Sequence, residues 1–132
     1  MISAQTSARQ YQQAQFQTVD RGRLLLMMFD GGDRFLAEAE RRLGSGDVPG
    51  FAQALSRAQA VIAELLATLD HRRGGEVARN LERLYRFMLD HLMEANLAKS
   101  ARHVLQVRRV FGIIGGAYRE ILRDGTPRLD VA

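Results

Sequence analysis

Histidine and carboxylate side chains are the first candidates for catalysis or metal binding in this sequence, because it contains no cysteine to act as a nucleophile or zinc ligand. The three histidines, His71, His91 and His103, lie in separate segments, and none has an acid three residues earlier. Helical bundles that hold a pair of metal ions use that Glu-x-x-His spacing. We therefore predict no catalytic residue, no metal site and no cofactor. An enzyme of the metal-carboxylate type stays an alternative, which bound metal would reveal.

Arginine is the other side chain that could do specific chemistry here, since its guanidinium group binds phosphate well. The chain has 19 basic and 15 acidic residues, a net charge of +4, and Lys99 as its single lysine. No five basic residues are consecutive, and many arginines have an acid three or four positions away, such as Arg79 with Glu82 and Arg86 with Asp90. This pattern favours solvated helix faces. A nucleic-acid-binding bundle is the alternative function, and its binding would depend steeply on salt.

Four amphipathic helices are expected to position these side chains, because apolar residues recur at spacings of three and four. The heptad is regular from Phe51 to Leu69, and the interior positions expected on the other helices include Leu24, Val77, Leu84, Met88, His91, Ala95 and Ile121. Turn-forming residues interrupt the chain at 44–47 and 71–75, and a weaker break occurs at 98–100. The first two helices should begin near Asp20 and Asp47, whose carboxylates can accept the free N–H groups of a first helical turn. No segment shows sustained two-residue alternation. The predicted fold is all-α, an antiparallel up-down-up-down four-helix bundle with a flexible N-terminal arm.

The 132 residues make one domain, with 46% hydrophobic and 26% charged residues, as is usual for a globular protein. We divide the chain into an arm at 1–19, a bundle at 20–124 and a tail at 125–132. The arm is rich in glutamine, serine, alanine and threonine but carries three spaced apolar anchors: Tyr11, Phe16 and Val19. The apolar runs of the chain as a whole are too short to cross a membrane, and no export signal is visible at its N-terminus. We therefore expect a cytoplasmic protein without membrane insertion.

The expected helices carry more apolar residues than a bundle interior needs, which is about three in seven. The additional side chains must wrap the core more broadly or form a groove. Glycines also interrupt two of the helices, at Gly31-Gly32 and at Gly112, Gly115 and Gly116. A glycine inside a helix costs about 1 kcal/mol relative to alanine, so another backbone should approach closely there. That backbone belongs either to the bundle or to a bound peptide.

Several segments resemble the flagellin-specific secretion chaperones of the FliS family. The resemblance runs from Tyr11 to about Ile121 and rests on the order and spacing of short motifs rather than on any single one. The motifs are YQQ at 11–13, TVD at 18–20, LLLMMFDG at 24–31, AQAVIAEL at 58–65, GGEVARNL at 74–81, LYRFM at 84–88 and LMEAN at 92–96. The chain departs from the family at 20–23, where Ser-Pro-Glu-Glu is common, and at Tyr118, where tryptophan is common.

The resemblance implies a cytoplasmic chaperone that binds the disordered C-terminal segment of flagellin, prevents premature polymerisation and keeps the subunit fit for type III export. The implied partners are flagellin and the flagellar export apparatus, with no nucleic acid, and the free protein could form a homodimer. A disordered client can bury apolar anchors in a groove between helices. The candidate groove and lid residues are Tyr11, Phe16, Val19, Leu25, Met28, Phe29, Tyr85, Leu92, Ala95, Asn96, Val107 and Phe111.

Overall fold

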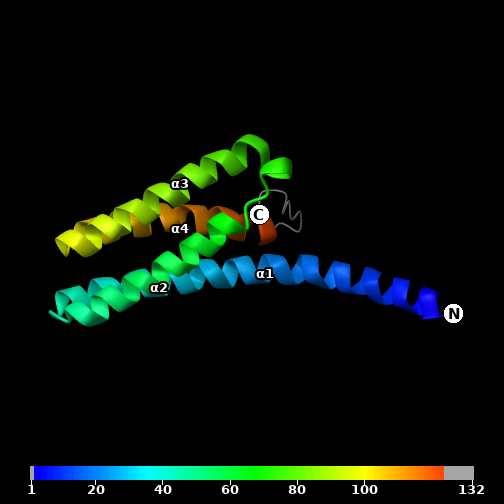
Figure 1. The fold of residues 1–132 in the computed structure, drawn as a ribbon, viewed down its shortest axis with the longest axis horizontal. Coiled ribbons are helices and arrows are strands. Elements are labelled where there is room, and N and C mark those ends of the chain that lie inside the picture. Colours follow the sequence, from blue (N-terminus) through cyan, green and yellow to red (C-terminus); the bar gives the residue numbers. More distant parts are fainter. Residues whose placement is uncertain (1, 124–132) are drawn as a thin grey trace.

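Four helices make up the fold in the computed structural model, which describes the backbone of residues 2–123 and the side chains of residues 21–123. They are α1 (Ile2–Gly44), α2 (Val48–Ala67), α3 (His71–Ala98) and α4 (Ala101–Arg123). Helix α1 packs on α2 and α4, and α3 packs on the same two helices, so that the four close into a bundle (Figure 1). The predicted all-α four-helix bundle is confirmed. The expected tail at 125–132 lies outside the described residues.

Helix α1 is much longer than predicted, because it begins at Ile2 rather than near Asp20 and spans 43 residues. The prediction of the helix start was therefore wrong. Residues 2–19 contain no glycine or proline, and their alanine, glutamine and arginine residues are good helix formers. In Figure 1 the N-terminal part of α1, coloured blue, projects beyond the other three helices. The Arg21 guanidinium, which donates to the Thr68 carbonyl oxygen at 3.4 Å, lies near the edge of the bundle.

The helix boundaries inside the bundle follow from capping. The Asp47 carboxylate accepts from the backbone N–H of Gly50 at 3.0 Å and begins α2, as predicted. Asp70 caps α3 in the same way, so His71 is already helical and the expected turn at 71–75 reduces to a kink at Gly75 (φ 53°, ψ −124°). The weak third break is confirmed at Lys99, whose left-handed backbone ends α3.

The interior consists of apolar stripes from all four helices, and no polar or charged residue among residues 21–123 is buried in it. The heptad predicted for α2 is confirmed from Phe51 to Leu65. On α3 Met88 and Ala95 are buried as predicted, but Tyr85 and Leu92 point inward in place of Leu84 and His91. Leu24, Val77, Leu84 and Ile121 were predicted on the interior seams, and the structure leaves them exposed. Within the described residues, no helix has the length and apolar character needed to span a bilayer.

Two tyrosines in the interior make the free energy of unfolding depend on pH in the alkaline range. Burial raises the pKa of Tyr118 from 10.0 to about 12, and burial also raises the pKa of Tyr85. The Tyr118 hydroxyl has no hydrogen-bond partner among the described residues. Both phenols are therefore held neutral by the fold.

We expect the free energy of unfolding to fall as the pH rises from 10 towards 12. Over that interval the unfolded chain releases the two phenolic protons while the folded chain keeps them, which costs at most about 1.4 kcal/mol per pH unit for each tyrosine. Denaturant unfolding between pH 9 and 12 measures this loss. The Tyr118→Phe variant should lose less stability over the same interval. An identical pH dependence in the variant and the natural protein would refute the assignment to Tyr118.

Candidate functional site

Most residues predicted to form a binding groove lie in the bundle interior. Leu25, Phe29, Tyr85, Leu92, Ala95, Val107 and Phe111 are buried, whereas Met28 and Asn96 are half-buried. The side chains of Tyr11, Phe16 and Val19 lie outside the described residues. The structure therefore places seven of the candidates in the core, where a partner could contact them only if the helices separated. Of the two alternatives for the additional apolar side chains, a broader core or a groove, these seven residues follow the first.

Two of the helical glycines are explained by this aromatic interior. The Phe29 ring lies 5.1 Å from that of Phe111 and 5.3 Å from that of Tyr118, measured between ring centroids. A Cβ atom at Gly32 would lie 2.6 Å from Cζ of Phe111, and one at Gly115 would lie 3.2 Å from Cδ1 of Phe29. The expected close approach of another backbone is therefore not what these two glycines serve. Aromatic side chains of the bundle itself fill the space beside Gly32 and Gly115.

Gly112 and Gly116 have a different environment, because a Cβ atom at either would meet no other atom within 4 Å. They line a hollow of about 220 Å³ between α1 and α4. The Arg119 guanidinium pairs with Asp30 at 2.6 Å and the Arg108 guanidinium pairs with Asp33 at 2.9 Å on the same side of the bundle. This hollow is small and has paired charges at its edge, so we do not assign the main binding surface to it.

A larger apolar surface follows the seam between α3 and α4. The register of these antiparallel helices is set where His91 Nε2 lies 2.5 Å from Gln106 Oε1. Leu84 lies seven residues, or about two helical turns, before His91, and therefore on the same edge of α3. Ile113 lies seven residues after Gln106, on the same edge of α4. Because the two helices are antiparallel, Leu84 and Ile113 face the same stretch of the seam.

We define the α3–α4 strip as the exposed apolar residues along this seam. Phe87 is 47% exposed and stacks on His91, with the ring centroids 5.0 Å apart. Ile113 is 74% exposed. The partly buried Val110 lies between Gln106 and Ile113 on α4. The strip consists of Val77, Leu84 and Phe87 on α3 with Ile113 and Ile121 on α4.

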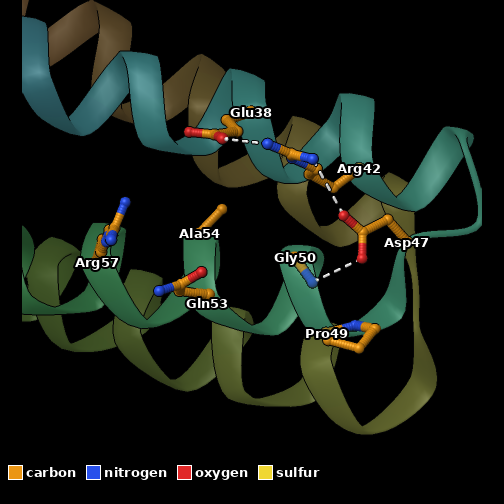
Figure 2. A pocket seen from close by; sticks show the side chains of 8 residues that line it. All are labelled: Glu38, Arg42, Asp47, Pro49, Gly50, Gln53, Ala54 and Arg57. Carbon is orange, nitrogen blue, oxygen red and sulfur yellow. Dashed lines mark hydrogen bonds and ion pairs between the residues drawn. The ribbon is translucent and has the colours of Figure 1, made fainter.

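A second hollow, of about 260 Å³, lies beside the α1–α2 turn (Figure 2). Three of its charged groups form one network, in which the Arg42 guanidinium bridges Glu38 at 3.3 Å and Asp47 at 3.1 Å. The fourth, the Arg57 guanidinium, lies over the Phe35 ring, 5.9 Å from its centroid. Asp47 also caps α2 through Gly50, as Figure 2 shows. These groups hold the turn together, and we assign no ligand to them.

The sequence analysis missed one group of potential metal ligands. His91 and Glu94 on α3 and His103 on α4 bring one ligand atom each within 4.8 Å of one another. The Glu-x-x-His spacing places an acid three residues before a histidine, whereas Glu94 lies three residues after His91. The His-x-x-Glu spacing, followed by a tight turn and a third ligand near the start of the next helix, was the signal that could have found it.

Comparison with known proteins identifies the family. The family model described as "Flagellar protein FliS" matches residues 3–125. The chain belongs to the FliS family. Among similar proteins, the flagellar secretion chaperone FliS of Salmonella typhimurium is 38% identical over 99 residues, which cover 74% of this chain and 73% of that protein. FliSB of Pseudomonas aeruginosa is 36% identical over 70% of this chain and 77% of its own length.

FliS of Campylobacter jejuni is 32% identical over 104 residues, covering 79% of this chain and 81% of that protein. The FliS resemblance read from the motifs is therefore confirmed. The FliS family is a family of chaperones rather than of enzymes. A chaperone needs a surface that binds another protein. The α3–α4 strip is exposed and apolar, as protein-binding surfaces commonly are.

Proposed function

We propose that this FliS-family chain is a cytoplasmic flagellar secretion chaperone that binds the disordered C-terminal segment of flagellin. Binding keeps flagellin from polymerising prematurely and maintains it in a form that the type III export apparatus accepts. The family match over residues 3–125 carries the proposal. The exposed apolar strip supports it, because it offers a surface on which a folding segment can bury apolar side chains.

The α3–α4 strip suits a client that forms an amphipathic helix on binding. From Val77 to Phe87 the strip extends about 15 Å at 1.5 Å per residue, or nearly three helical turns. Apolar side chains spaced three or four residues apart on a client helix could lie along it. The client would thereby cover Phe87 and Ile113, which water contacts in the free chaperone. A second copy of this chain could cover the same strip in the absence of client, which would make a homodimer.

The arginines offer less support to the nucleic-acid alternative. Arg42, Arg86, Arg108 and Arg119 each pair with an acid of the same chain, so their charge is partly compensated. A gel-shift assay with generic DNA at low and moderate salt tests that alternative directly. Binding that weakens steeply with salt would support it.

Co-expression with the C-terminal segment of flagellin tests the proposed function. Size and stoichiometry measurements should show a complex of one chaperone with one flagellin segment that survives moderate salt. A flagellin lacking this segment is the matched control and should not co-purify. If the two flagellins behave alike, the proposed function is wrong.

The N-terminal arm gives a further prediction. We propose that Tyr11, Phe16 and Val19 cover part of the apolar surface in the free protein and move away when the client binds. In the structure the arm continues α1 and projects beyond the bundle (Figure 1), so the proposed cover requires the arm to bend back onto the bundle. Deletion of residues 1–17 should raise client affinity and increase proteolysis of the free bundle. If affinity and proteolysis are both unchanged, the arm is not a lid.

A further inference from the structure

We propose that His91, Glu94 and His103 form a binding site for a divalent transition-metal ion of the zinc type. The site lies at the end of the bundle where α3 turns into α4. Neither the family match nor the proposed function requires it. The inference stands on the geometry of these three side chains and of the groups that hold them.

The three potential ligand atoms converge on one point. His103 Nε2 lies 3.4 Å from Glu94 Oε2, and His91 Nδ1 lies 3.9 Å from the same oxygen. Ligand atoms at 2.0–2.2 Å from a tetrahedral zinc ion are about 3.3 Å apart. The two separations from Glu94 are close to this value, and all three ligand atoms lie within 4.8 Å of one another. The two imidazole rings are stacked with their centroids 4.3 Å apart. Small rotations of the side chains would complete the site.

Groups around the site orient the two histidines. The side-chain oxygen of Gln106, Oε1, can only accept a hydrogen bond, so His91 Nε2, at 2.5 Å, donates to it. His103 Nδ1 lies 2.8 Å from Ser100 Oγ and can donate to it. With those protons outside the cluster, His91 Nδ1 and His103 Nε2 are the unprotonated nitrogens on the side of the Glu94 carboxylate. Metal-binding histidines are held in this way, with the second ring nitrogen donating to a neighbouring oxygen.

A cation would relieve the repulsion among two nitrogen lone pairs and a carboxylate. Imidazole and carboxylate ligands suit zinc, and three protein ligands leave a fourth position for water. Glu94 is exposed, so solvent and ions reach the site. Because His91 and Glu94 belong to α3 and His103 to α4, a bound metal would join the two helices beside their turn. It would also hold His91 against Phe87 at one end of the α3–α4 strip.

Zinc titration of the full chain, without an affinity tag, tests the site. Isothermal titration calorimetry should show one zinc ion bound per chain, and excess zinc should raise the Tm by several degrees. Glu94→Gln and His103→Gln should each weaken zinc affinity at least tenfold and reduce the Tm increase. Cobalt(II) should give the visible absorption of a tetrahedral complex in the natural protein and lose it in both variants.

His71→Gln is the matched control, because His71 lies outside the cluster. Its Nε2 atom is 3.0 Å from Glu82 Oε2 instead. The zinc affinity of this variant should equal that of the natural protein. Zinc affinity that is unchanged by Glu94→Gln and His103→Gln, or lost in His71→Gln, would overturn the proposal. Flagellin binding does not enter these measurements, so the site can be refuted independently of the proposed function.

Discussion

Phe111→Ala should lower the free energy of unfolding by about 3–5 kcal/mol, the usual cost of removing a buried phenylalanine. The Phe111 side chain is 1% exposed and packs on Phe29 and on the α1 backbone at Gly32. Its removal would leave a cavity between α1 and α4 that the helices cannot close fully. Urea unfolding monitored by circular dichroism measures the loss.

Ile113→Ala is the matched control for this experiment, because Ile113 lies two residues away on α4 but on the exposed face. Its unfolding free energy should change by no more than about 0.5 kcal/mol. The comparison distinguishes a core position from a surface position among the apolar residues of α4. A small effect at Phe111 would mean that this residue lines an open groove after all.

Phe87→Glu and Ile113→Glu should each reduce affinity for the flagellin C-terminal segment by roughly 30-fold or more, if the α3–α4 strip binds the client. Central apolar side chains of an interface commonly contribute 2 kcal/mol or more to binding. A buried carboxylate without a partner would add a desolvation cost. Isothermal titration calorimetry with the purified segment measures the affinities, and circular dichroism verifies that each variant is folded.

Leu97→Glu is the control for the strip. Leu97 is 80% exposed near the end of α3, ten residues and about 15 Å along the helix from Phe87. Its affinity for the segment should remain within about threefold of the natural value, since a surface substitution outside an interface changes binding little. If Leu97→Glu weakens binding as much as Phe87→Glu does, the client binds a different face of the bundle.

Heptad spacing was sufficient to predict the four helices, their antiparallel order and the core residues of α2. It was insufficient for α3, where leucine, tyrosine, histidine and methionine occur on adjacent stripes. Both stripes are apolar enough to face inward, and the choice depends on packing against α2 and α4. Tyr85 and Leu92 took the interior positions, so Leu84 was left on the surface.

The candidate site was harder to predict than the fold. An excess of apolar residues indicated spare surface, but it could not say which of them would remain exposed. Phe29 and Phe111 were assigned to a groove from the excess of apolar residues and the family resemblance, and the structure shows that Gly115 and Gly32 admit their rings into the core. The cluster of His91, Glu94 and His103 depends on the register between two helices, which no spacing within one helix reveals.

The heat-capacity change of binding measures how much apolar surface of the bundle a flagellin segment covers. Calorimetric titrations of the full chain with the flagellin C-terminal segment at several temperatures should give a 1:1 complex. Burial of 1,000–3,000 Å² of mainly apolar surface predicts a heat-capacity change of about −0.2 to −0.6 kcal/mol/K. A value near zero, or binding that disappears on a modest increase in salt, would contradict the account.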